Sequence, residues 1–145
     1  MLFMLRRLFE ARGDDFDAAF ATTFADARVA LQQRDFDAVL SDINLGDGTA
    51  FDLFECQPYT PFVLLTGVED QETVIQAVRA GAFEYFLKGS LTDSLSLLPL
   101  TIERAARKKQ QDEERRMLAA AVAGANDAIF ITDLEGYIVF ANEAC

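Results

Sequence analysis

Three short runs of largely apolar residues, each followed at once by a polar residue, constrain the fold of this sequence most. The runs are Ala38–Ser41, Phe62–Leu65 and Glu84–Leu87. The first two are nearly continuous in apolar residues, which is typical of parallel strands covered on both faces. Helical patterns separate the runs, so strands and helices alternate along the chain. This alternation predicts an α/β fold, an open parallel sheet with flanking helices.

The remaining elements are predicted from the same periodicities and from helix-end signals. They are a further strand at Phe16–Ala21 and helices at Met1–Arg12, Phe24–Gln33, Phe51–Cys56, Glu69–Ala80 and from about Thr92 onward. Gly81 is expected to cap the C-terminus of the helix before it. Pro99 is expected to kink the last helix near its start.

Composition excludes several classes of function. Of the 145 residues, 51% are hydrophobic and 13 are Phe, which is incompatible with a disordered chain. The net charge of −11 would repel nucleic acid and anionic membranes, so neither is expected as a partner. Histidine is absent, which excludes His metal ligands, His general bases and phosphohistidine intermediates within these residues.

The cysteines and the apolar runs predict a cytoplasmic protein. Cys56 and Cys145 lie far apart and in no paired motif, as is typical of reduced thiols. No apolar run is long enough to span a bilayer. The apolar stretch Met1–Leu5 precedes Arg6 and Arg7 instead of following them, which is the wrong order for a signal peptide.

A stretch without any apolar residue divides the chain. Residues 107–116 read RKKQQDEERR and cannot pack into a core. They are good helix formers, with opposite charges at i,i+4 spacing. We therefore predict a solvated connecting helix at 107–118, between a first domain at 1–106 and the beginning of a second at 119–145.

The polar residues that follow the three runs point to phosphoryl chemistry. The carboxyl ends of parallel strands lie at one edge of a sheet, where α/β proteins bind their ligands. Asp42, Thr66 and Lys88 stand at these ends. A nucleophilic carboxylate beside a hydroxyl and a cation is suited to accepting a phosphoryl group and holding its oxygens. Each residue alone could be the ordinary polar end of a buried strand, but the combination is more specific.

At these residues the sequence resembles the receiver domain of response regulators in two-component signalling. The motifs that carry the resemblance are LSDINLGDGTAFDLF, PFVLLTG and AVRAGAFEYFLKG. The resemblance implies a flavodoxin-like fold, with Asp42 as the phosphoacceptor and the backbone carbonyl of Asn44 as a ligand of Mg²⁺. It also implies that Thr66 hydrogen-bonds the phosphoryl group and that Lys88 pairs with it. Tyr85 matches the aromatic residue that reorients on activation, with an ordinary strand residue as the plain alternative.

Three positions depart from the usual family pattern without excluding it. Gly46 stands where a proline is usual, Ala50 where a second glycine is common, and Gly89 where a proline often follows the lysine. These are tolerable variations, and Gly89 makes a cis peptide at that point unexpected.

The N-terminal region departs more seriously. The family begins with an apolar strand and an acidic pair that binds Mg²⁺, whereas a helical pattern here already begins at Met1. Asp14 and Asp15 precede the predicted strand Phe16–Ala21, so we expect them at the opposite edge of the sheet from Asp42. A missing first strand would leave two inner edges unpaired, and Asp42 would be the only carboxylate for Mg²⁺. We therefore expect a receiver domain that lacks its first strand, through a misplaced start or degeneration, with its Mg²⁺ cofactor in doubt.

Residues 119–145 resemble the opening of a PAS sensor domain. The segment NDAIFITDLEGYIVFANEAC predicts a hairpin, because Ile129 and Ile131 alternate with Phe130 before a turn at Asp133–Gly136. An ordinary hairpin is the plain alternative. Two strands cannot enclose a ligand pocket, so we expect only a fragment of such a domain.

These features predict a non-enzymatic phosphoacceptor in a multidomain signalling protein. Asp42 would take a phosphoryl group from a partner histidine kinase or histidine phosphotransfer protein and relay a conformational change to a C-terminal sensor or output region. A homodimer through the last receiver face and the connecting helix fits this design.

Two alternatives stay open. One is a receiver that acts without phosphorylation as an interaction or dimerisation module, which the short N-terminus favours. The other resembles the haloacid-dehalogenase phosphatases, which also use a strand-end Asp with a Ser or Thr and a Lys. That family places a second Asp two residues after the nucleophile as general acid/base, and Asn44 cannot take this role.

Overall fold

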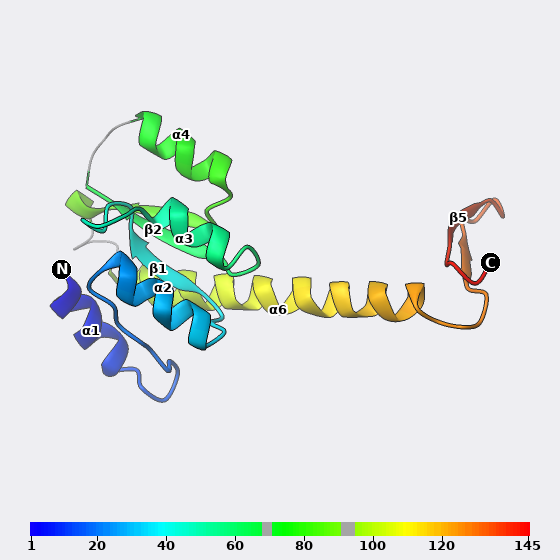
Figure 1. The fold of residues 1–145 in the computed structure, drawn as a ribbon, viewed down its shortest axis with the longest axis horizontal. Coiled ribbons are helices and arrows are strands. Elements are labelled where there is room, and N and C mark those ends of the chain that lie inside the picture. The colour runs from blue at the N-terminus through cyan, green and yellow to red at the C-terminus, as the bar shows by residue number, and fades with distance from the viewer. Residues whose placement is uncertain (68–70, 91–94) are drawn as a thin grey trace. The chain divides into compact units, whose positions relative to one another are not determined.

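Two compact units make up the chain. The computed structural model describes residues 1–67, 71–90 and 95–145, and the chain divides into Met1–Lys109, named unit 1, and Gln110–Cys145, named unit 2 (Figure 1). Helix α6, Leu97–Ala123, supplies residues to both units.

A parallel sheet forms the centre of unit 1, as predicted. Its strands are β1 (Val39–Asp42), β2 (Phe62–Thr66) and β3 (Glu84–Leu87), in the order β1-β2-β3. Every residue of β2 is buried, because it has a strand on each side and apolar side chains against both faces. Among the described residues, no strand pairs with the outer edge of β1.

The helices of unit 1 begin and end near the predicted residues. They are α1 (Leu2–Glu10), α2 (Phe24–Gln33), α3 (Ala50–Cys56), α4 (Gln71–Ala80), the short 3₁₀ helix η1 (Lys88–Ser90) and the first part of α6. Gly81 follows α4 and closes it, as predicted. Pro99 lies in the first turn of α6, where its missing N–H removes no intrahelical bond. The predicted helix starts at Glu69 and Thr92 lie outside the described residues.

Two apolar clusters cover the two faces of the sheet. Leu64 and Leu65 are neighbours in β2, so their side chains point to opposite faces. Leu64 packs in the cluster that contains residues of α2 and α3, whereas Leu65 packs with Leu5 of α1 and Leu98 of α6. The sheet therefore lies between helical layers that hold its strands in register.

The strand predicted at Phe16–Ala21 is wrong, because this segment is irregular. An extended segment becomes a strand only where a neighbour supplies backbone hydrogen bonds, and no described strand pairs with it. Its aromatic rings contact α1 instead. The ring of Phe16 meets that of Phe9 at 5.2 Å, and the Arg6 guanidinium lies 4.7 Å from the centre of the Phe20 ring. The alternating pattern thus reflects packing on a helix.

A carboxylate from the loop after β1 holds the N-terminus of α2. Asp47 accepts hydrogen bonds from the N–H groups of Phe24 at 2.7 Å and Ala25 at 3.1 Å. The Thr23 hydroxyl caps the same end by accepting the Asp26 N–H at 3.1 Å. The bonds from Phe24 and Ala25 favour the charged carboxylate and hold the pKa of Asp47 below its ordinary value of 3.8.

A β-hairpin follows α6 in unit 2, as predicted. Its strands β4 (Phe130–Thr132) and β5 (Ile138–Ala141) pair antiparallel. In the turn between them, the Asp133 carboxylate accepts the Tyr137 N–H at 2.8 Å. All residues of both strands are exposed.

Asn142 ties this hairpin to the end of α6 within unit 2. Its amide nitrogen donates to the carbonyls of Val122 at 3.1 Å and Asp127 at 3.0 Å, and its oxygen accepts the Ile129 N–H at 2.9 Å. The side chain is buried, with 6% exposed. A buried amide is stable only with such partners, so Asn142 fixes the junction of helix and hairpin.

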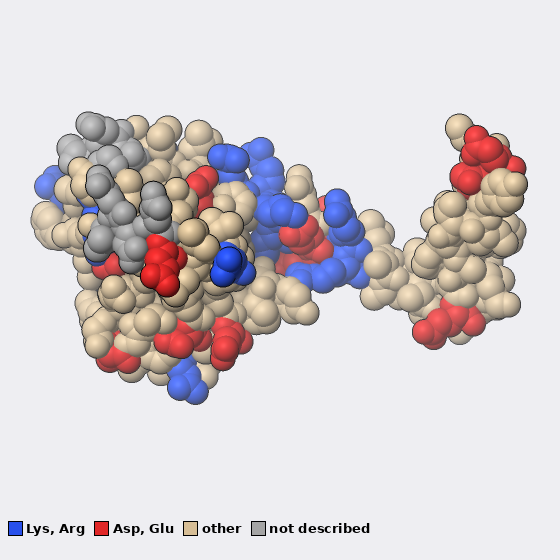
Figure 2. Space-filling model, turned by 90° about the horizontal axis from the view of Figure 1, so that it is seen from above, with Lys and Arg blue, Asp and Glu red and all other residues tan. Residues whose placement is uncertain are grey.

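The stretch at 107–116 is helical, as predicted, but it is not wholly solvated. Lys109, the third residue of the stretch, is buried, because its ammonium has partners in unit 1. Charged side chains of both signs gather along the rest of this part of α6 (Figure 2). None of the helices in the described part of the chain is long and apolar enough to cross a membrane.

The first test concerns the core. Leu64 is fully buried, so Leu64→Ala would leave a cavity beside α2 and α3 and should lower the free energy of unfolding by about 2–5 kcal/mol. Denaturant unfolding followed by circular dichroism measures this loss. Leu100→Ala, at a 54% exposed position of α6, is the matched control and should cost no more than about 0.5 kcal/mol. Equal losses in the two variants would contradict the proposed core.

The second test concerns Asp47 and pH. Because the folded-state pKa of Asp47 is lowered, its contribution to stability is present above its ordinary pKa of 3.8 and is lost as the pH falls through the folded value. We expect Asp47→Asn to lower the melting temperature at neutral pH, and the difference from the parent protein to shrink below about pH 3.8. Asp14→Asn, at an exposed position, is the control. A difference that does not depend on pH would exclude this carboxylate cap.

Candidate functional site

The carboxyl ends of the three strands open into one hollow of about 430 Å³. The residues that line it are Asp42, Ile43, Asn44, Thr66, Gly67, Thr73 and Lys88. Asp42 and Thr66 are the last residues of β1 and β2, and Lys88 directly follows β3. The structure thus brings together the three strand-end residues that the sequence analysis selected.

Parallel pairing explains why these ends meet. Asp42 lies in register with Leu65, and Thr66 lies in register with Leu87. Thr66 therefore stands one residue level beyond Asp42, and Lys88 stands one level beyond Thr66. The three side chains leave the sheet within two residue levels of one another, and all three line the hollow beyond the strand ends.

An ion pair lies in this hollow. Lys88 Nζ donates to Oδ2 of Asp42, and the two side chains are 26% and 36% exposed, so both stay in contact with water. Thr66 is buried, with 4% exposed. The arrangement places a carboxylate that can act as a nucleophile beside an ammonium that can balance additional negative charge and a hydroxyl that can donate a hydrogen bond.

The loop after β1 carries Asn44 along the hollow. The Leu45 N–H donates to the Gly48 carbonyl at 3.0 Å, across a turn in which Gly46 has a φ of +84°. Proline fixes φ near about −65° and cannot adopt this conformation, so the turn itself requires glycine where the family pattern usually has proline. Asp47 holds the same loop through its bonds to α2.

Some residues of this site were not singled out from the sequence. Thr73, in the first turn of α4, lines the hollow, and no local signal distinguishes this residue. Asp47 stands beside glycine residues, which indicates a turn. This position does not identify α2 as the helix that Asp47 caps. Tyr85 does not line the hollow but lies in β3 with 37% of its surface exposed. Asp14 and Asp15 also lie outside its lining, although the strand used to place them is absent.

The hollow offers Mg²⁺ few ligands. Asp42 is the only carboxylate among the described lining residues, and its Oδ2 is held by Lys88. Mg²⁺ is usually bound by one or two carboxylates together with phosphate oxygens. In residues 1–67, 71–90 and 95–145, no group of three or more Cys, Asp or Glu side chains could hold a metal. The described residues alone do not fit a resident Mg²⁺, and the Asn44 carbonyl stays a predicted ligand.

The sequence of this chain is similar to a known domain family and to several known proteins. The model of the response regulator receiver domain matches residues 1–97. The response regulator protein PilR of Pseudomonas aeruginosa is 36% identical over 76 residues, which are 50% of this chain and 17% of PilR. The acid tolerance regulatory protein ActR of Sinorhizobium medicae is 30% identical over 108 residues, which are 72% of this chain and 54% of ActR. The chain thus spans only part of the length of these relatives.

Solved structures share the fold of unit 1. A response regulator receiver domain protein from Clostridium thermocellum gives a TM-score of 0.63 at 22% identity, over 76% of this chain and 88% of that one. A response regulator from Burkholderia pseudomallei, solved with a phosphorylated aspartic acid, a calcium ion and citrate, gives a TM-score of 0.57 at 25% identity, over 76% of this chain and 64% of that one. Together with the match over residues 1–97, the α/β fold shows that this chain belongs to the response regulator receiver domain family.

Proposed function

We propose that this protein is a phosphoacceptor module of two-component signalling and that Asp42 is the residue that becomes phosphorylated. The observation that carries the proposal is the convergence of Asp42, Thr66 and Lys88 on one hollow. Family membership supports it, as does the Burkholderia pseudomallei protein, whose structure contains a phosphorylated aspartic acid. The alternative phosphatase lacks a general acid/base, because Asn44 stands where that residue is needed.

The proposed transfer uses the carboxylate as its nucleophile. An oxygen of Asp42 attacks the phosphorus of a phosphohistidine on a histidine kinase or histidine phosphotransfer protein. The P–O bond forms while the P–N bond breaks, and the electron pair of that bond returns to the donor imidazole. The phosphohistidine lies outside these 145 residues, since they contain no His. Lys88 and Thr66 would hold the phosphoryl oxygens in the product.

The response would be relayed by elements on the β3 side of the sheet, opposite the β1 side. Tyr85 is the proposed switch residue, and its partial exposure in β3 leaves it room to change rotamer. Large apolar side chains are exposed on α4, β3 and the start of α6, namely Ile75, Val78, Tyr85, Leu97 and Leu100. Exposed apolar surface of this kind favours the predicted homodimer through the last receiver face.

The resemblance of residues 119–145 to the opening of a PAS domain stays a prediction. The hairpin that it requires is present as β4 and β5. A hairpin occurs in many folds, however, and the receiver match ends at residue 97.

Mass spectrometry after incubation with acetyl phosphate tests the phosphoacceptor. We expect the parent protein to gain one phosphoryl group in the presence of Mg²⁺ and Asp42→Asn to gain none, because the nucleophilic oxygen is lost. Asp37→Asn, which changes an exposed Asp just before β1, is the matched control and should react like the parent. A parallel sample without Mg²⁺ measures how far the reaction depends on the metal.

A folded parent protein that gains no phosphoryl group would overturn this proposal. That result would favour the receiver that acts without phosphorylation, for which the supporting observation is that Asp42 is the one carboxylate among the described lining residues. Circular dichroism of the same samples shows whether each protein is folded.

Lys88→Ala tests the ion pair. The ammonium lies against Asp42 and would balance the charge that develops on the phosphoryl oxygens. We expect the time course of acetyl phosphate modification to slow by at least about ten-fold. Lys108→Ala, at an exposed position of α6, is the control. An unchanged rate in Lys88→Ala would remove Lys88 from the proposed site.

A further inference from the structure

Lys109 is the one charged side chain that is buried in the described part of the chain, with 4% exposed. It lies in the stretch 107–116 of α6, whose other charged residues are exposed except for the half-buried Asp112. Burying an ammonium group is costly unless it is paired and hydrogen-bonded. The position of Lys109 therefore depends on its partners.

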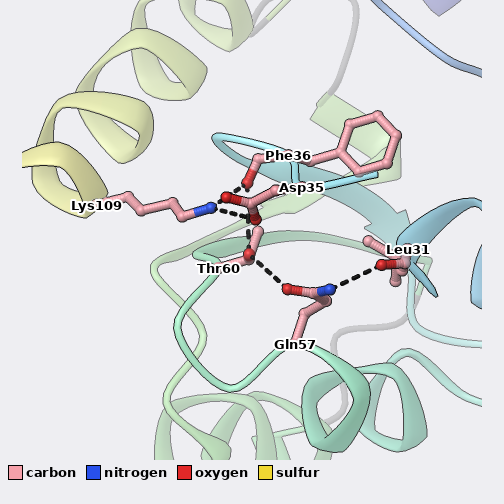
Figure 3. Close-up of polar contacts among 6 residues, drawn as sticks. All are labelled: Leu31, Asp35, Phe36, Gln57, Thr60 and Lys109. Atoms are coloured by element: carbon pink, nitrogen blue, oxygen red, sulfur yellow. Dashed lines mark hydrogen bonds and ion pairs between the residues drawn. The ribbon is translucent and has the colours of Figure 1, made fainter. Parts of the chain in front are cut away.

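These partners lie in the segment that leads into β1. Lys109 Nζ donates to Oδ1 of Asp35 at 2.6 Å and to the carbonyl of Phe36 at 2.7 Å (Figure 3). The Asp35 side chain is 71% exposed, so the pair lies at the edge of the core with the ammonium on the buried side. One side chain of α6 thus holds a carboxylate and a backbone carbonyl that are distant in sequence.

Further hydrogen bonds extend this contact to two more segments. The Thr60 hydroxyl lies 3.4 Å from both the Phe36 carbonyl and Oε1 of Gln57. Gln57 Nε2 donates to the Leu31 carbonyl of α2 at 2.7 Å (Figure 3). Thr60 is buried as well, with 6% exposed. The network therefore joins α6 to the ends of α2 and α3 at the amino edge of the sheet.

Lys109 also ends the face of α6 that packs in unit 1. Thr101, Ala105 and Lys109 are spaced by four residues and are all buried, so they form one stripe along the helix. No residue of α6 after Lys109 is buried. The polar contact thus stands at the point where packing against unit 1 stops.

We propose that Lys109 is a clasp, which holds the last packed turn of α6 to the segment before β1 and sets where the self-supporting part of the helix begins. Phe36 lies three residues before Val39, the first residue of β1, and β1 ends at Asp42. The clasp therefore connects α6 to the strand that carries the proposed phosphoacceptor, at the end of that strand remote from the hollow. This proposal rests on the contacts of Lys109 and does not require that Asp42 is phosphorylated.

Hydrogen exchange measured by mass spectrometry on the full 145-residue chain tests the clasp. Lys109→Met keeps the aliphatic stem but removes the ammonium, so peptides that cover residues 101–109 should exchange about ten-fold faster. Asp35→Ala should accelerate them further, because it removes the Asp35 carboxylate from the buried ammonium. Lys108→Met, at the exposed neighbour, is the matched control and should leave the exchange unchanged. Peptides from β2 report global stability and should not accelerate.

Two results would overturn the clasp. One is exchange in Lys109→Met that matches Lys108→Met over residues 101–109. The other is equal acceleration in β2, which would make Lys109 a residue of general stability. Asp35→Asn keeps an acceptor oxygen and supplies a milder variant if Lys109→Met does not fold. The same selective acceleration is expected from it, and its absence would also overturn the proposal.

Discussion

The parallel register of β1, β2 and β3 is the constraint on which the fold and the candidate site both depend. Asp42 is level with Leu65 and Thr66 with Leu87, so the three polar ends stand at consecutive steps along one edge. A slip by one residue would turn every side chain of a strand to the other face. Because Leu64 and Leu65 pack in different clusters, such a slip would cost the core as well as the site. Apolar packing therefore maintains the geometry of the polar residues.

This dependence explains why the centre of unit 1 could be predicted from the sequence. Strands that are covered on both faces have nearly continuous apolar runs, and the first polar residue after each run marks its end. The segment Phe16–Ala21 has a weaker signal, because alternation reports one buried face without identifying what covers it. In the structure that face contacts α1 through Phe16 and Phe20, so the local pattern indicated a packed face but did not identify its partner.

The positions that could not be predicted depend on contacts between distant residues. Lys109 is buried because of Asp35, 74 residues earlier, although its neighbours in sequence are polar. Asp47 reaches back 23 residues to the Phe24 N–H. In each case one polar side chain satisfies backbone groups at the end of an element. Such contacts are decided by the folded arrangement, since the same residues in an isolated helix or loop would be solvated.

Two side-chain contacts, made by Asp47 and Lys109, connect the segments on either side of β1 to helices, and a change at Asp42 could spread through them. Phosphorylation would replace the charge of one carboxylate by a phosphoryl group of about −2, and Lys88 would then face a larger charge on other oxygens. The loop that begins beside Asp42 is tied to α2 by Asp47, and the segment before β1 is tied to α6 by Lys109. Both ties are made by single side chains to backbone groups, so each can be removed separately. The two segments that flank β1 are therefore tied to different helices, the loop after it to α2 and the segment before it to α6.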